Sequence, residues 1–478
     1  MAERSVAVSI VVEVAGSKRI ATEFAVEGAE CGEALQVELK RVGCQVISGV
    51  LEELDDRLRE DVPSDWRNVG KETRTVLTTL GQVAIRRRVY RDGSRERHKP
   101  LDEVLGLKKY ERLSTEVKAK GAYLASEVSY RQAAGMLSWM VDEAINHSRI
   151  QRIVWEMGTA LAEAERQELE ATFRRGEAID AGKVEAPTLY GESDGVHIHL
   201  QREEKRSAEV RVGIMYTGKR AIGVGRRALE NKTCLTALVE NSQEWQEMLL
   251  KAAYVNYDLE NTQQLIVGGD GNSWVRQSFD RFEINQVFQL DRFHLYRAAR
   301  RAFGHNQETN ELVRRCCTSG LMAVEDDLRT FMAQANCAQR KRINAFAKYV
   351  YQNTDVLIDY DRRLAPSSQK RCTLGAIEGN VDKLVVYRMK GRGRSWRRAG
   401  ARAMLAICRH KAALQQAAFK LPQTNTNPAS HLGRKHTCTK DADWLQRNVP
   451  VLHSAAEGRP WVQTLKKRIN GRSDLSFI

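Results

Sequence analysis

The sequence predicts an α/β fold for the central part of this 478-residue chain, and three observations support the prediction. Two short apolar runs, 265–267 and 287–290, each lead into an acid. Strand-like and helix-like periodicities alternate between residues 188 and 296, and a helical, strongly basic stretch then breaks this alternation. The chain is long enough for two to four domains. We divide it into 1–105, 106–180, 181–296, 297–370, 371–420 and 421–478.

Residues 1–105 are predicted to form an α+β module. Apolar residues alternate from Val6 to Val12, a turn follows at Gly16, and alternation resumes at Ile20, as in a β-hairpin. From Cys31 to Glu60 the apolar positions recur every three or four residues, which indicates an amphipathic helix. Two more strand arms, between Thr73 and Asp92, meet at Gly81.

Residues 106–180 are predicted to be helical. Ser129 is a good cap for a short helix, and Asn146 or His147 can cap a second one that continues as a connector. Two helices around a tight connection are typical of the helix-turn-helix, whose second helix reads bases. We predict Arg149, Gln151 and Arg152 as DNA contacts, because they lie on the polar face. An ordinary three-helix bundle gives the same pattern.

Residues 181–296 give the element order of a ribonuclease-H-like core. Strand-like runs begin at Thr188 and near Ala208, 219–226 reads as a third strand, and a helix covers Ser242 to Tyr257. The strands that end at Asp270 and Asp291 follow. In this fold the first and fourth strands lie side by side, which would bring Asp194 and Asp270 together.

Each acid also has an ordinary structural explanation. Asp270 can begin a turn after the Gly268-Gly269 pair, and Asp291 can cap the following helix. Residues 297–370 read as an all-helical insertion, after which Glu378 stands near a helix start in the second part of the core, 371–420. A glutamate there can simply complement the helix dipole.

Together, the acids predict a metal site. Two aspartates from adjacent strands and a glutamate from a following helix would form an all-oxygen cluster suited to Mg²⁺ or Mn²⁺. Two such ions can activate a water or a 3′-hydroxyl during in-line attack on phosphorus. We predict Asp194, Asp270 and Glu378 as catalytic ligands, with Asp291 and His294 in supporting roles; Asp291 competes with Asp270 for the second carboxylate position.

The charge predicts a polyanionic partner. The chain has 76 basic and 61 acidic residues, a net charge of +15 and a sequence pI near 9.4. Fourteen lysines and arginines and no acid lie between Asp382 and Asp441, which include part of a basic C-terminal tail at 421–478. We expect double-stranded DNA as the partner, and Trp396 could also stack on an unpaired base. The predicted contacts in this run are Arg388, Lys390, Arg392, Arg394, Trp396, Arg397 and Arg398.

The chain carries no apolar run of about 18 residues or more, so no membrane span is expected. Its start is too acidic for a secretory signal, and its nine cysteines lack paired spacing. We expect a cytoplasmic, bacterial, nucleoid-associated protein with reduced thiols and no membrane partner.

From about residue 70 onwards, the sequence resembles DDE-type insertion-sequence transposases of the ISLre-like bacterial group. The resemblance rests on an ordered set of motifs: SYRQAAGML, ESDGVHIHLQ, GGDGNSWV, LDRFHLY and GAIEGNV with RMKGRGRSW. The sequence from Asp291 to His294 also resembles a motif of the Mutator and hAT transposases, which carry a helical insertion in the same place. Arg397 and Arg398 depart from the small polar residue that related proteins often have after the tryptophan.

The resemblance implies a metal-dependent enzyme with Asp194, Asp270 and Glu378 as its catalytic triad. It implies cleavage and joining of DNA strands at the terminal inverted repeats of a mobile element. Pairing two element ends would require a homodimer or a larger assembly. Two other functions fit the same sequence: a catalytically inactive DNA-binding protein of transposase descent, and a ribonuclease-H-like nuclease that cuts without joining.

Overall fold

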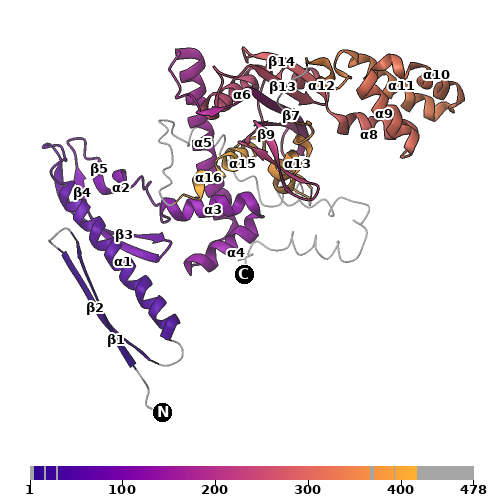
Figure 1. The fold of residues 1–478 in the computed structure, drawn as a ribbon. Helices are drawn as coiled ribbons and strands as arrows, with labels where there is room; N and C mark the ends of the chain where they lie inside the picture. The colour runs from indigo at the N-terminus through magenta and orange to yellow at the C-terminus, as the bar shows by residue number, and fades with distance from the viewer. Residues whose placement is uncertain (1–4, 15–17, 28–30, 366–370, 392, 417–478) are drawn as a thin grey trace, which may run out of the picture. The chain divides into compact units, whose positions relative to one another are not determined.

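The computed structural model describes residues 5–14, 18–27, 31–365, 371–391 and 393–416. The N-terminal part begins with an antiparallel hairpin and a long helix (Figure 1). Its elements are β1 (Ser5–Val14), β2 (Lys18–Glu27), α1 (Cys31–Arg57), β3 (Arg67–Thr78), β4 (Gly81–Arg91), β5 (Arg97–His98) and α2 (Pro100–Val104). The predicted hairpin, helix and second pair of strands are therefore all present.

The N-terminal module has a small core of its own. Strands β3, β4 and β5 form an antiparallel sheet, and α1 packs on β4. Alternate residues of β4, Val83 and Ile85, are buried, as a strand with one covered face requires. Asp102 accepts hydrogen bonds from Arg74 and Arg87, each at 2.7 Å, and so joins α2 to both long strands.

Three helices follow: α3 (Thr115–Glu127), α4 (Tyr130–Val141) and α5 (His147–Arg175). Ser129 forms a capping box with Gln132 at the start of α4, and the Asn146 side chain accepts from the Arg149 backbone nitrogen at the start of α5. Leu137 and Ile150 are fully buried between the helices. The predicted caps and the tight connection between α4 and α5 are present.

Helix α5 is the connector to the central sheet. It runs without a break for 29 residues and ends at Arg175, with Gly176 as its C-terminal cap. It packs against α15 (Arg398–Arg409), where a Cβ on Gly158 would lie 2.2 Å from the carbonyl oxygen of Ala403. Only glycine allows the two helix backbones to approach this closely.

The central sheet has five strands in the order β11-β8-β7-β13-β14 (Figure 1). They are β7 (Thr188–His199), β8 (Ser207–Tyr216), β11 (Thr233–Ala237), β13 (Gln264–Gly269) and β14 (Asn285–Leu290). The strands β7, β8 and β11 are antiparallel neighbours, whereas β13 pairs in parallel with both β7 and β14. The predicted side-by-side placement of the Asp194 and Asp270 strands is correct.

The prediction of 219–226 as a sheet strand is wrong. Residues 218–230 form a separate hairpin of β9 (Gly218–Gly223) and β10 (Arg226–Glu230), and the third strand of the sheet is β11. Leu235 and Ala237 of β11 supply the buried apolar side chains that a sheet strand needs. The 219–226 segment has the alternation of a strand but carries cations that cannot be buried there.

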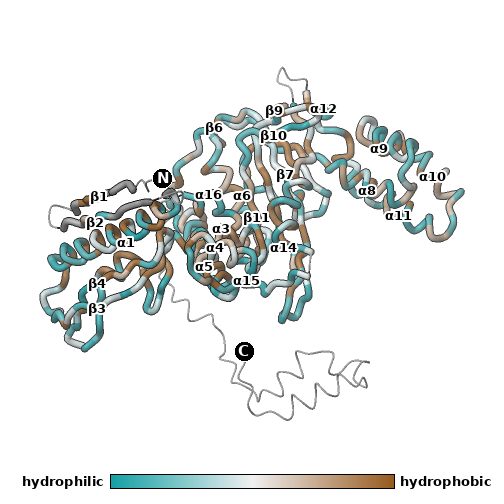
Figure 2. The backbone as a smooth tube through the Cα atoms, turned by 90° about the horizontal axis from the view of Figure 1, so that it is seen from below, coloured by the Kyte–Doolittle hydropathy of each residue, from teal (hydrophilic) through white to brown (hydrophobic). Residues whose placement is uncertain are grey.

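Helices cover the sheet and close its core. Helix α6 (Ser242–Asn256) contributes the fully buried Trp245 and Leu249. Along these strands hydrophobic segments alternate with hydrophilic ones (Figure 2). Short elements complete this part: β6 (Val184–Glu185), β12 (Tyr257–Asp258), α7 (Ser273–Arg276) and a 3-10 turn at Gln277–Phe279.

The described residues of the predicted insertion, 297–365, are mainly helical and form no strand, as predicted. Helix α8 begins at Arg292, directly after β14 and the capping Asp291. The insertion has its own apolar core, including the fully buried Val313, Cys316 and Val350. Its helices are α8 (Arg292–Phe303), α9 (Gln307–Ser319), α10 (Glu325–Gln334), α11 (Cys337–Gln352) and α12 (Tyr360–Arg363), with 3-10 turns at Leu321–Ala323 and Thr354–Val356.

The last described segment returns to the sheet. Its elements are α13 (Ile377–Val381), a π-helical turn at Asp382–Val386, α14 (Tyr387–Met389), α15 and α16 (Lys411–Leu414). The predicted basic tail, 421–478, lies outside the described residues. None of the helices within the described ranges is long and apolar enough to cross a membrane.

Candidate active site

Three aspartates follow one another across neighbouring parallel strands. Gly268 of β13 pairs with Glu192 of β7, and Gly269 pairs with Leu290 of β14. Continuing this register brings Asp270 to the level of Asp194 on one side and of Asp291 on the other. The acids therefore collect where β13 and β14 end, at the carboxyl edge where open α/β sheets bind ligands.

The closest group at this edge contains Asp194, His294 and Glu378. One ligand atom from each lies within 4.8 Å of the others. The three residues come from β7, α8 and α13, and are separated by long stretches of chain. The structure thus brings together two of the three predicted catalytic acids and adds the imidazole that was predicted to have a supporting role.

Asp270 lies beside this group, and its side chain is used locally. Its carboxylate accepts from the Asn272 backbone nitrogen at 3.0 Å and from the Asn272 side-chain nitrogen at 2.6 Å. It is close enough to influence the ionisation of both Asp194 and His294. Asp270 therefore begins a turn, as its ordinary structural explanation predicts, and it also lies near the predicted site.

The environment of Asp194 disfavours its charged form. Burial raises the pKa of Asp194 to about 6, and the charges of Asp270 and Glu378 act in the same direction. The Gly195 backbone nitrogen, which donates to Asp194 at 2.7 Å, and His294 oppose this shift. Carboxylates gathered at a buried position repel one another until a cation compensates them.

Asp291 orients His294. The Asp291 side chain caps α8 by accepting from the Phe293 backbone nitrogen, and it also lies 2.8 Å from Nδ1 of His294. Burial lowers the pKa of His294, but the Asp291 hydrogen bond and the nearby Asp194 charge outweigh it, so that the pKa is raised overall. With Nδ1 held by Asp291, Nε2 is the ring nitrogen left to bind a ligand, as in many metal-binding histidines.

This donor set fits a divalent cation. The carboxylates of Asp194 and Glu378 are ligands that Mg²⁺ and Mn²⁺ accept, and the imidazole of His294 favours Mn²⁺ of the two. The raised pKa of Asp194 shows a site where added positive charge would be stabilising. Asp270 would complete the oxygen donors if its side chain turned from Asn272 towards Asp194.

Glu192 fixes the helix that carries Glu378, and the sequence prediction missed this residue. It is 1% exposed and lies two residues before Asp194, on the same face of β7. Its carboxylate accepts from the backbone nitrogens of Gly375 (2.9 Å), Ala376 (2.9 Å) and Ile377 (3.1 Å). It thereby ties the start of α13 to the Asp194 strand.

Hydrogen bonds to the Glu192 carboxylate offset part of the cost of burying its charge. Burial raises its pKa, while hydrogen bonds from Tyr216 and from the α13 amides act against this rise. The Tyr216 hydroxyl donates to it at 2.7 Å. A glutamate and an aspartate two residues apart in the same strand-like run were the only sequence signal for this arrangement.

The helical insertion contacts the other side of the site. The Tyr349 hydroxyl of α11 donates to the backbone oxygen of Asp270 at 2.9 Å. Arg276 donates to Asn353 at 2.7 Å and to Asp355 at 3.0 Å. The insertion therefore helps to fix the turn that presents Asp270.

The predicted DNA contacts on α5 have different surroundings. Gln151 and Arg152 are exposed. Arg149 is largely covered and forms an ion pair with Glu111. Two of the three predicted side chains are thus free to reach a ligand.

The basic run after α13 is partly internal. Lys390 and Arg397 are exposed, Arg394 donates to the Tyr387 backbone oxygen, and the Arg398 backbone nitrogen donates to Glu203 at 3.0 Å. Arg392 lies outside the described residues.

Arg388 and Trp396 are not surface residues, which corrects their predicted role. Arg388 is 4% exposed, donates to the Ala125 backbone oxygen and lies over the Tyr130 and Trp396 rings. Trp396 is 7% exposed and donates from Nε1 to the Met389 oxygen at 2.8 Å. Both side chains join the basic run to the α3–α4 region, so we do not retain them as DNA contacts.

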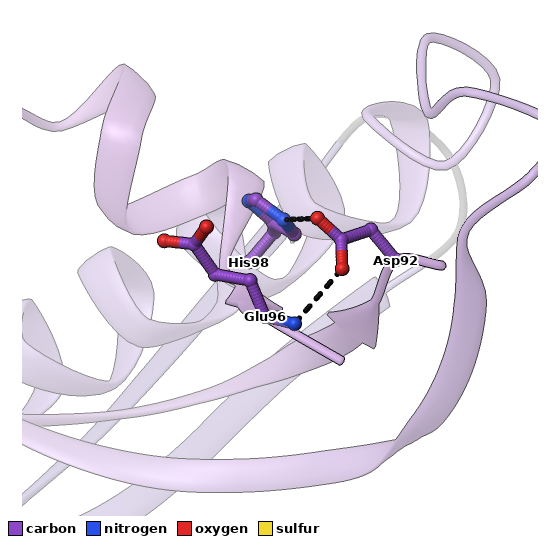
Figure 3. A group of neighbouring side chains, drawn as sticks. All are labelled: Asp92, Glu96 and His98. Carbon is purple, nitrogen blue, oxygen red and sulfur yellow. Dashed lines mark hydrogen bonds and ion pairs between the residues drawn. The ribbon is translucent and has the colours of Figure 1, made fainter. Parts of the chain in front are cut away.

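A second group of possible ligands lies in the N-terminal module. Figure 3 shows Asp92 joined to the His98 ring and to the Glu96 backbone nitrogen. The Asp92 carboxylate also accepts from Ser94 at 2.7 Å, and His98 stacks on Trp66 with ring centres 3.9 Å apart. The turn before β5 accounts for these contacts, so we assign no metal to this group.

Comparisons with known proteins give a family and one distant relative. A family model described as "Uncharacterised protein family (UPF0236)" matches residues 24–417. The chain is 23% identical over 391 residues to a UPF0236 protein in the vanSb 3′ region of Streptococcus gallolyticus, covering 78% of this chain and 81% of that protein.

A cryo-EM structure of the simian T-cell lymphotropic virus intasome in complex with PP2A regulatory subunit B56 gamma also matches. It is 12% identical, covers 53% of this chain and 78% of that one, and has a TM-score of 0.14. A similarity this weak supports no conclusion about fold or partner.

Proposed function

Because the chain belongs to the uncharacterised protein family UPF0236, we propose its function from the site itself: it is a DNA transposase that cleaves and joins strands at the ends of an insertion sequence. The observation that carries the proposal is the convergence of Asp194, Glu378 and His294, with Asp270 beside them, at the carboxyl edge of the parallel strands.

The order of the sheet supports a ribonuclease-H-like core. Three antiparallel strands, β7, β8 and β11, are followed by two that extend the sheet in parallel on the other side of β7. The position of Asp194 in β7 and of Asp270 after β13 is the one expected for two catalytic acids in this fold. The exposed Gln151 and Arg152 near the start of α5 support a helix-turn-helix that binds the terminal inverted repeats.

The side chains have distinct roles in this proposal. Asp194 and Glu378, with Asp270, would hold divalent ions, and Asp291 would keep the His294 ring in place. When bound, such ions supply the Lewis acidity that activates a water or a 3′-hydroxyl and stabilises the leaving oxygen. Double-stranded DNA is the partner, and pairing of two ends requires a homodimer or larger assembly in the bacterial nucleoid.

The direct test incubates the full chain with labelled DNA carrying the inverted repeats that flank its gene. We expect cleaved ends and, with target DNA present, joined products, in Mg²⁺ or Mn²⁺ and not in EDTA. Cleavage without joined product would indicate a nuclease. Binding without either product in both metals would indicate a DNA-binding protein with no catalytic activity.

Asp270 and Asp291 are distinguished by their roles. We expect Asp270→Asn to lower metal-dependent cleavage by about a thousandfold, because a ligand to the catalytic ions is lost. We expect Asp291→Asn to lower it by roughly 10- to 100-fold, because only the partner of His294 changes. Initial cleavage rates at saturating Mn²⁺ measure both effects. The reverse order of the two variants would transfer the second-carboxylate role to Asp291.

A further inference from the structure

The β9–β10 hairpin has the composition of a nucleic-acid contact. Residues 218–230 contain one lysine and three arginines but only one acid, Glu230. Arg220, Arg226 and Arg227 are exposed, and none of them forms an ion pair with any acid in the described ranges. Many other exposed arginines of this protein are paired, including Arg166, Arg314 and Arg329. The hairpin therefore presents uncompensated positive charge.

The tip of the hairpin is apolar and uncovered. Ile222 is 53% exposed, and Val224, which lies between Gly223 and Gly225, is 103% exposed. These two apolar side chains therefore do not contribute to a core of the protein. Arginines that flank a projecting apolar residue are the combination with which several proteins enter the minor groove of DNA.

The base of the hairpin is linked to the residues that hold α13 against β7. On one side it follows Tyr216, which donates to Glu192, and Lys219 lies 5.6 Å from the centre of the Tyr216 ring. On the other side, Lys232 donates at 3.1 Å to Asn380, two residues after Glu378. Figure 1 shows β9 in the neighbourhood of β7 and α13. The hairpin is thus anchored on β8 and α13, the elements that pack against the Asp194 strand.

We propose that the β9–β10 hairpin binds duplex DNA next to the cleavage site. Arg220, Arg226 and Arg227 contact phosphates, and the Ile222–Val224 tip enters the minor groove. The inference rests on the proposed function, since it names the DNA surface of the same site. The hairpin was no part of the DNA contacts predicted from the sequence, which lay in α5 and in the run after α13.

The test measures DNA affinity as a function of salt. Fluorescence anisotropy with a labelled duplex compares the full chain with the triple variant Arg220→Gln/Arg226→Gln/Arg227→Gln. The matched control is Arg166→Gln/Arg314→Gln/Arg329→Gln, which changes the net charge equally but removes only arginines that are already paired with acids. We expect the hairpin variant to lower affinity by about tenfold or more and the log–log salt slope by about 2.7, as three lost phosphate contacts require.

A further variant, Val224→Ser, tests the tip. It should lower affinity while leaving the salt slope unchanged, because no cation is lost. Affinity equal to that of the wild type would remove the tip from the proposed contact.

The outcomes separate the two proposals. Equal losses in the triple variant and its control, or no loss in either, would overturn the hairpin contact without affecting the cleavage result. Loss confined to the hairpin variant would support the contact even if the wild type cut no DNA, in which case only the transposase proposal would fail. Equal binding of single-stranded RNA, with the same change in slope, would overturn the assignment to duplex DNA.

Discussion

The Glu378→Gln variant is expected to lose metal-dependent DNA cleavage by about a thousandfold or more, because a neutral amide replaces a carboxylate ligand. The substitution should not destabilise the fold. The Glu378 side chain is half-buried, and the change removes one of the charges that raise the pKa of Asp194. The free energy of unfolding without metal should therefore remain at, or rise slightly above, that of the wild type.

Two measurements check this result. Cleavage of end DNA gives the rate, and the melting temperature with and without Mn²⁺ reports metal binding independently of activity. The wild type should be stabilised by Mn²⁺ and the variant much less so. Glu308→Gln, an exposed glutamate in the first turn of α9, is the matched control and should behave as the wild type does. Wild-type cleavage by Glu378→Gln would exclude this residue from the catalytic group.

Replacement of Glu192 by Gln should also have a large effect, although Glu192 is not itself a proposed ligand. An amide has one acceptor oxygen, and its NH₂ group would face backbone amides that also donate. We expect a loss of about 2–4 kcal/mol in stability, because buried donors are left without partners. We also expect the Mn²⁺ concentration needed for half-maximal cleavage to rise, because the start of α13 would no longer be tied to the Asp194 strand.

Tyr216→Phe separates a positioning role from a general loss of stability. It removes one donor to Glu192 but leaves the three backbone hydrogen bonds to α13 in place. Its stability should fall by roughly 1 kcal/mol, and its metal requirement should stay near that of the wild type. If Glu192→Gln were destabilised but kept the wild-type metal requirement, Glu192 would be a purely structural residue.

The local patterns of the sequence predicted much of the architecture. The amphipathic period of residues 31–60 and the caps at Ser129 and Asn146 correspond to α1, α4 and α5. Asp270 and Asp291 stand at the ends of parallel strands, as their apolar runs indicated. Such features depend on burial of one face of an element or on hydrogen bonds within a few residues, so that neighbouring residues suffice to specify them.

The same patterns failed where the outcome depended on distant partners. The segment 219–226 alternates as a strand does, yet β11 fills the third position in the sheet because Leu235 and Ala237 pack into its core. Arg388 and Trp396 stand in a basic run, yet they are buried against one another and against residues of α3 and α4.

The sequence by itself determined most of the strands and helices, though not the third strand of the sheet, and it placed Asp270 and Asp291 after the ends of strands. The tertiary structure alone decided that His294 stands with Asp194 and Glu378, and that Glu192 accepts hydrogen bonds from the backbone of residues 375–377, more than 180 positions away. The physical reason is that periodicity encodes which face of an element avoids water. The partner that satisfies a buried polar group is chosen only when remote segments pack together.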